Sequence, residues 1–138
     1  MIKNLNVLLV EDDDVAAESV TRSLNKVVPE VPVVNARHGR EALDMINESG
    51  KIQSPYIVLL DLNMPVMDGF EFLEEVRSTP NLSNTVIFVL TTSNDDRDRM
   101  QAYHHNVAGY MVKSAVGPQF SKLAHLLRTY KDAVELGA

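Results

Sequence analysis

Polar side chains that could do chemistry follow directly on short apolar runs of the sequence. They are Glu11, Asp12 and Asp13 after the first run, Asp61 after the third, Thr91 and Thr92 after the fourth, and Lys113 after the fifth. Two carboxylates about 4 Å apart repel each other by roughly 4 kcal/mol at an effective dielectric of 20, so such acids call for a cation if folding brings them together. Oxygen ligands in a chain without cysteine favour a hard ion, and Mg²⁺ before Ca²⁺, because a Ca²⁺ loop places its acids at alternate positions around a glycine. Mg²⁺ beside a lysine and a threonine hydroxyl is typical of a site that handles a phosphoryl group.

The elements that must position these side chains can be inferred from the apolar pattern. Five strands are predicted at Leu5 to Val10, Val31 to Ala36, Tyr56 to Leu60, Val86 to Leu90 and Ala108 to Val112. Between and after them, apolar residues recur at spacings of three and four, which predicts amphipathic helices. The nearly continuous apolar runs indicate strands buried on both faces, as in a parallel sheet covered by helices. We therefore expect an α/β fold of the (βα)₅ type, a doubly wound five-stranded parallel sheet whose strands carry ligand-binding residues at their carboxyl ends.

The acidic run at residues 11–14 has a simpler explanation, which has to be weighed against a metal site. Carboxylates are favoured at a helix N-terminus, and we expect Asp14 to cap the helix that follows. Asp61 argues against that explanation for the whole set, because it directly follows a buried strand and does not lie on a solvated helix face.

Length and composition narrow the classes of protein. A chain of 138 residues with 45% hydrophobic and 23% charged residues is expected to form one domain over residues 1–138, with no output domain. The net charge of −6 and the scattered Lys and Arg residues argue against nucleic acid or a membrane surface as a partner. The apolar stretch before Glu11 is too short for a signal peptide, so we expect a cytoplasmic protein.

Several motifs, taken together and in order, resemble the receiver domain of two-component response regulators. They are Val7-Leu8-Leu9-Val10-Glu11-Asp12-Asp13, Leu59-Leu60-Asp61-Leu62-Asn63-Met64-Pro65 with Met67-Asp68-Gly69, Val89-Leu90-Thr91-Thr92, and Gly109-Tyr110-Met111-Val112-Lys113. The resemblance covers almost the whole chain and implies a flavodoxin-like sheet with strand order 2-1-3-4-5. Leu90-Thr91-Thr92-Ser93, Tyr103 and the long segment before the third strand are also similar to single-domain regulators that serve phytochrome-type and hybrid histidine kinases.

The resemblance implies a role for each site residue. Asp61 would accept a phosphoryl group from a histidine kinase or phosphotransfer protein. Its Mg²⁺ cofactor would be held by Glu11, Asp12, Asp61 and the main-chain carbonyl of Asn63, while Lys113 would pair with phosphoryl oxygens. Thr91, chosen over its neighbour because it directly follows the last apolar strand residue, and Tyr110 would form a conformational switch. Output would be contact with a downstream protein or onward phosphotransfer, with a homodimer possible through the face of the fourth helix, fifth strand and fifth helix.

Three other functions are less consistent with the residues. A dehalogenase-type phosphatase also uses an aspartate after a strand with Mg²⁺, but it needs a second aspartate two residues on as general acid, where this chain has Asn63. The glycines fit neither G-x-G-x-x-G nor the phosphate-binding P-loop, which argues against a nucleotide-binding protein. A receiver-like module that no longer takes phosphate is hard to reconcile with every motif position being filled.

One position departs from the family pattern. Receivers usually have proline after the strand-five lysine with a cis peptide bond, but here Ser114 follows Lys113. A cis bond before a residue other than proline costs about 2.5 to 4 kcal/mol, against about 0.5 to 1 before proline. We therefore expect Lys113–Ser114 to be trans, with the following loop changing direction at Gly117.

Overall fold

The computed structural model describes residues 1–48 and 50–136, in which strands and helices alternate along the chain. The elements are β1 (Asn6–Val10), α1 (Asp14–Val27), β2 (Val33–Ala36), α2 (Gly39–Asn47), β3 (Tyr56–Leu60), α3 (Gly69–Ser78), β4 (Ile87–Thr91), α4 (Asp96–His104), β5 (Gly109–Val112), the 3₁₀ helices η1 (Lys113–Ala115) and η2 (Pro118–Phe120), and α5 (Ser121–Ala133). The predicted (βα)₅ order is confirmed, and the strands begin or end at most two residues from the expected positions.

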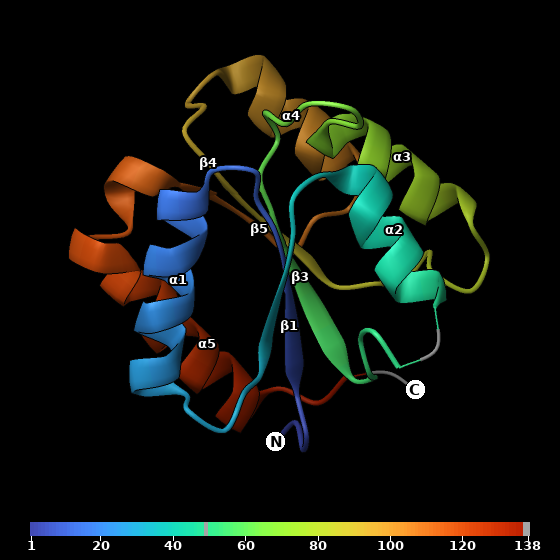
Figure 1. Cartoon of the computed structure of the whole chain (residues 1–138). Helices are drawn as coiled ribbons and strands as arrows, with labels where there is room; N and C mark the ends of the chain where they lie inside the picture. Colours follow the sequence, from blue (N-terminus) through green and yellow to red (C-terminus); the bar gives the residue numbers. More distant parts are fainter. Residues whose placement is uncertain (49, 137–138) are drawn as a thin grey trace.

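The strands form one parallel sheet in the order β2-β1-β3-β4-β5, which confirms the doubly wound topology. Helices α1 and α5 cover one face of this sheet, and α2, α3 and α4 cover the other (Figure 1). In β1 and β3, Val10 lies opposite Leu60, so the residues that follow these two strands leave the sheet at the same level. The pairing of β1 with β3 therefore places residue 11 beside residue 61.

The apolar core is divided into two clusters by the sheet. On one side Val20 and Leu24 of α1 pack with Leu123 and Leu127 of α5, and on the other side α2 and α3 pack on the alternate residues of the same strands. Helix α4 contributes Ala102 as its buried residue. Strands β1, β3 and β4 are buried on both faces as expected, whereas β2 and β5 are mostly half-buried because they are edge strands.

Side chains at the first turns fix where the helices begin. The expected cap of α1 was wrong by one residue: the N-cap is Asp13, whose carboxylate accepts hydrogen bonds from the amides of Val15 at 2.9 Å and Ala16 at 3.3 Å. Asp14 is the first residue of the helix, where its negative charge interacts favourably with the positive end of the helix dipole. Helix α3 begins with a reciprocal capping box between Asp68 and Glu71.

Two turns use the left-handed region of backbone conformation. Asn106 follows α4 with φ of 59°, and Gly117 has φ of 83° at the expected change of direction. Within the described residues the cis peptide bond is Ser54–Pro55, so Lys113–Ser114 is trans, as expected.

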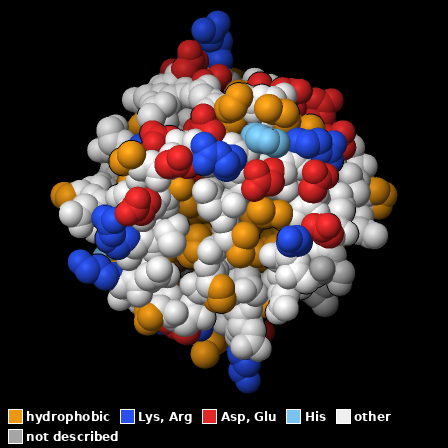
Figure 2. Space-filling model, viewed as in Figure 1, with side chains coloured by type: hydrophobic (Ala, Val, Ile, Leu, Met, Phe, Trp, Pro, Cys, Tyr) orange, Lys and Arg blue, Asp and Glu red, His pale blue; other side chains and the backbone are white. Residues whose placement is uncertain are grey.

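The surface is charged and mixed. Acidic and basic side chains are interspersed over the face in view in Figure 2, with apolar side chains gathered near its centre and its upper edge. None of the helices in the described part of the chain is long and apolar enough to cross a membrane.

Candidate functional site

The predicted acidic residues meet at the carboxyl ends of β1 and β3. Glu11, Asp12 and Asp61 each offer a carboxylate oxygen, and these oxygens all lie within 4.8 Å of one another. Glu11 and Asp61 are buried and Asp12 is half-buried, so their charges are poorly screened by water. The main chain holds the two strand ends in place, because the amide of Asp61 donates to the carbonyl of Val10 at 3.0 Å.

Lys113, at the end of β5, supplies the positive charge of this cluster. Its ammonium donates a hydrogen bond to Glu11 Oε1 at 2.5 Å and lies 3.9 Å from Asp61 Oδ2. Burial raises the pKa of Glu11 from 4.5 to about 7, the hydrogen bond from Lys113 opposes that rise, and the nearby charge of Asp61 adds to it. The site therefore holds more negative charge than one lysine neutralises, which favours binding of a cation.

The structure separates the two threonines at the end of β4. Thr91 is fully buried, and its hydroxyl oxygen accepts a hydrogen bond from the amide of Ser93 at 3.4 Å, whereas Thr92 is exposed. The buried hydroxyl is therefore the one the strand presents at the carboxyl edge of the sheet.

The loop after β3 is held close to Asp61 by its own backbone. The amide of Asn63 donates to Asp61 Oδ1 at 3.4 Å, and the amide of Gly69 donates to the carbonyl of Leu62 at 3.0 Å. A Cβ atom at Gly69 would lie 2.6 Å from Leu62 Cα and 2.7 Å from the Asp61 carbonyl oxygen. Only glycine fits at this point without moving the loop.

Tyr110 lies outside the acidic cluster, against the loop between β4 and α4. Its hydroxyl donates to the carbonyl of Ser93 at 3.0 Å, and the guanidinium of Arg99 lies 5.7 Å from the centre of its ring. The Ser93 hydroxyl in turn donates to Asp98 Oδ2 at 2.6 Å. Tyr110 and Thr91 therefore both contact Ser93, although they belong to different strands.

Two side chains that the sequence did not single out reach the acidic loop from β2 and the residue after it. Asn35 donates to the main-chain carbonyl of Glu11, and Arg37 donates to that of Asp12. The expected strand order does not give the register between β1 and β2, so the sequence carries no signal for these contacts.

Residues 7–125 match the sequence profile of the response regulator receiver domain. The chain belongs to this family. Receiver domains are signalling modules that work with histidine kinases and downstream targets, and this receiver is 32% identical over 111 residues to the response regulator Rcp1 of Synechocystis sp., covering 78% of this chain and 76% of Rcp1. It is 35% identical over 109 residues to the probable methanogenesis regulatory protein FilR2 of Methanothrix harundinacea, covering 78% of this chain and 70% of FilR2.

Solved structures of receivers have the same fold. The Mn²⁺-bound form of Rcp1 gives a TM-score of 0.82 at 30% identity, covering 96% of this chain and 99% of that one. The phosphorylated cyanobacterial phytochrome response regulator RcpA gives 0.80 at 29% identity, covering 93% of this chain and 94% of that one. The expected resemblance to regulators of phytochrome-type kinases is therefore confirmed. The cluster of Glu11, Asp12 and Asp61 fits the divalent metal site of receivers, since its ligand atoms are all carboxylate oxygens.

Proposed function

We propose that this receiver takes a phosphoryl group on Asp61 from the phosphohistidine of a histidine kinase or phosphotransfer protein, in a Mg²⁺-dependent reaction. The observation that carries the proposal is the cluster itself, in which Asp61 lies 3.9 Å from Lys113 Nζ and shares its corner of the sheet with the oxygens of Glu11 and Asp12. A carboxylate oxygen of Asp61 attacks the phosphorus in line, the bond between phosphorus and the donor nitrogen breaks, and the electron pair leaves with the imidazole.

The surrounding residues would hold the charges of this transfer. Glu11, Asp12, Asp61 and the main-chain carbonyl of Asn63 would hold Mg²⁺, which when bound neutralises phosphoryl oxygens. Lys113 would release its hydrogen bond to Glu11 and pair with a phosphoryl oxygen as a point charge. By its own action the protein would promote only its own phosphorylation and dephosphorylation.

Output would come from a conformational switch. We infer that the Thr91 hydroxyl donates to the phosphoryl group and that Tyr110 turns inward, which changes the face made by α4, β5 and α5. This face would bind a downstream protein or a second copy of the chain, and the phosphoryl group could instead pass onward in a phosphorelay. Residues 1–138 would act as one receiver domain in the cytoplasm, without contact to nucleic acid or membrane.

The test is intact mass after treatment with a small acyl phosphate and Mg²⁺. Wild type should gain one phosphoryl group, and Asp61→Asn should gain none. Asp68→Asn is the matched control, because Asp68 lies in the same loop and asparagine caps a helix about as well as aspartate. If Asp61→Asn gained a phosphoryl group to the same extent as wild type, another residue would be the acceptor and the assignment would be refuted.

The metal requirement is tested in the same assay. With a chelator in place of Mg²⁺ the rate should fall to background, because a phosphoryl anion would have to approach three carboxylates whose charge Lys113 alone only partly compensates. An unchanged rate in chelator would show that Glu11 and Asp12 do not act as metal ligands.

A further inference from the structure

Strand β2 holds the acidic loop of the site, although none of its residues belongs to the site. We propose that Asn35 and Arg37 are positioning residues that fix the main chain of Glu11 and Asp12 for metal binding. This inference rests on the proposed Mg²⁺-dependent phosphorylation.

The amide group of Asn35 spans the end of β1. Its Nδ2 donates to the carbonyls of Leu9 at 2.9 Å, Glu11 at 3.2 Å and Ala36 at 3.1 Å. The regular pairing of β1 with β2 ends where the Glu11 amide donates to the Ala36 carbonyl. The side chain of Asn35 therefore extends the hydrogen bonding by one further group, to the carbonyl of the first acidic residue.

Arg37 continues this pattern for the next residue. One end of its guanidinium donates to the Asp12 carbonyl at 3.2 Å, and the other pairs with the carboxylate of Asp14. Asn35 lies in β2 and Arg37 directly follows the strand, and both side chains reach toward the residues that follow β1. Successive carbonyls of the acidic loop are thus held by one side chain of β2 and one from the residue that follows it.

These contacts matter because the loop carries groups that repel one another. The carboxylates of Glu11, Asp12 and Asp61 lie within 4.8 Å, and without restraint the Asp12 segment can relieve the repulsion by turning toward solvent. Donors on the main-chain carbonyls oppose this movement without neutralising the ligands themselves. Partners that orient metal ligands in this way typically account for about 10- to 100-fold in metal affinity.

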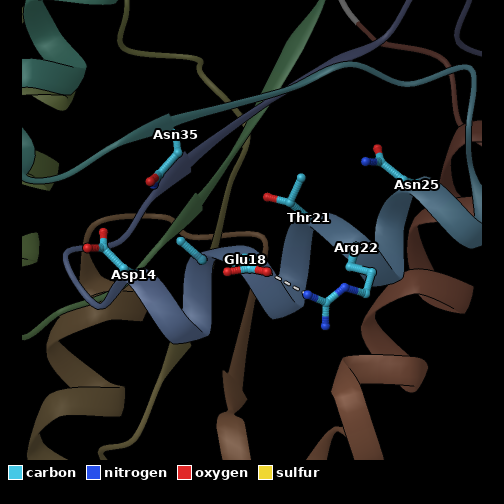
Figure 3. A pocket seen from close by; sticks show the side chains of 7 residues that line it. Asp14, Glu18, Thr21, Arg22, Asn25 and Asn35 are labelled. Carbon is cyan, nitrogen blue, oxygen red and sulfur yellow. Dashed lines mark hydrogen bonds and ion pairs between the residues drawn. The ribbon is translucent and has the colours of Figure 1, made fainter.

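A purely structural role does not explain the residue type at position 35. Asparagine is disfavoured in strands, and a valine there would suit a half-buried edge strand better. Asn35 faces a groove of about 490 Å³ between β2 and α1, where Thr21 and Asn25 also line the wall (Figure 3). The groove offers room for an apolar side chain, so space alone does not require an amide at this position.

The experiment compares metal affinity with stability in three variants. Asn35→Val removes the donors and improves strand propensity, and Arg37→Met removes the second donor at an exposed position where folding is not at risk. Asn25→Ala is the control, because Asn25 lines the same groove as Asn35. Within the described residues, Asn25 makes no hydrogen bond to the acidic loop, in contrast to Asn35. Mg²⁺ binding is measured by titration calorimetry, and unfolding of the metal-free protein by urea.

Asn35→Val should weaken Mg²⁺ binding about 10-fold, and Arg37→Met about 3-fold, as expected for loss of one exposed hydrogen bond. The urea midpoint of metal-free Asn35→Val should equal or exceed that of wild type. In phosphorylation by acyl phosphate, the Mg²⁺ concentration for half-maximal rate should rise while the rate at saturating Mg²⁺ stays the same. Asn25→Ala should match wild type throughout.

The outcomes separate this inference from the proposed function. Wild-type affinity for Mg²⁺ in both Asn35→Val and Arg37→Met would overturn the positioning role. A weaker affinity would also overturn it if the free energy of unfolding of the metal-free variant fell by as much as the free energy of Mg²⁺ binding, because the role would then be structural. If wild type itself neither binds Mg²⁺ nor becomes phosphorylated, the proposed function fails instead.

Discussion

Replacing Glu11 by glutamine should stabilise the metal-free protein while removing one of the proposed metal ligands. Burial raises the pKa of Glu11 from 4.5 to about 7. Above pH 7 the side chain is ionised in both states, and the ionised form is less favourable in the folded protein than in the unfolded chain. At about 1.4 kcal/mol per pKa unit, charging this group costs the fold up to about 3 kcal/mol. Glutamine has nearly the same shape and no charge, so Glu11→Gln should recover most of that cost at pH 8. The loss of the partner of Lys113, whose ammonium still lies 3.9 Å from Asp61, reduces the gain.

The sign of the pH dependence follows from the direction of the pKa shift. A carboxyl whose pKa is raised on folding takes up a proton in the native state, so wild type loses stability as pH rises from about 4.5 through about 7. The difference between Glu11→Gln and wild type should be near zero at pH 4.5 and largest above pH 7. With Mg²⁺ at 100 times its dissociation constant, wild type should regain about 2.7 kcal/mol by mass action, and the variant much less.

Urea unfolding in a chelator at pH 4.5, 6 and 8 measures this directly. Glu18→Gln is the control, because Glu18 is an exposed carboxylate of α1. A stability difference between Glu11→Gln and wild type that is the same at pH 4.5 and pH 8 would refute the reasoning, as would a variant less stable than wild type at pH 8 without metal.

Three further changes test contacts that hold the fold. Glu30 has a pKa lowered to about 2, chiefly by the hydrogen bond from Arg128, so its stabilising effect is complete above pH 4.5 and is lost as pH falls toward 2. Glu30→Gln should therefore have a lower urea midpoint than wild type at pH 7 and the same midpoint near pH 2; equal midpoints at pH 7 would contradict this. Gly69→Ala should lower the free energy of unfolding in urea by about 1 to 3 kcal/mol or more, because its Cβ would lie 2.6 Å from Leu62 Cα; a wild-type value would show that the loop yields freely. Asp13→Ala should cost about 1 kcal/mol in thermal unfolding and Asp13→Asn only a few tenths, since asparagine also caps a helix; equal losses would mean that the charge matters more than the cap.

Much of the site could be predicted because its residues directly follow apolar strands. Asp61 and Lys113 stand at the ends of apolar runs whose length and composition mark them as strands, and parallel strands bring their carboxyl ends to one edge. The cap of α1 was assigned wrongly because four acidic residues stand in a row, and the pattern does not locate a helix start to one residue. Asp13 and Asp14 are equivalent until the backbone is known.

Contacts of side chains with main-chain carbonyls of other segments could not be predicted. Asn35 reaches Glu11 because of the register of β2 on β1, which the expected strand order does not give. Arg77 of α3 is another example, since its guanidinium donates to main-chain carbonyls of Ser83, Thr85, His105 and Asn106. An isolated arginine on a helix would be assigned to the solvated face, whereas burial here lowers its pKa.

Helix α4 buries little apolar surface, so it can separate from the sheet more readily than α3. Its buried residue is Ala102, whereas α3 buries Phe72, Leu73 and Val76, so the free energy needed to open α4 locally is far smaller. Its amide protons should therefore exchange with solvent sooner than those of α3. Hydrogen bonds hold both ends of this helix, since Arg77 donates to the carbonyls of His105 and Asn106, and the Ser93 hydroxyl donates to Asp98 in the first turn. A helix held in this way can be displaced by a small difference in contact free energy between two states.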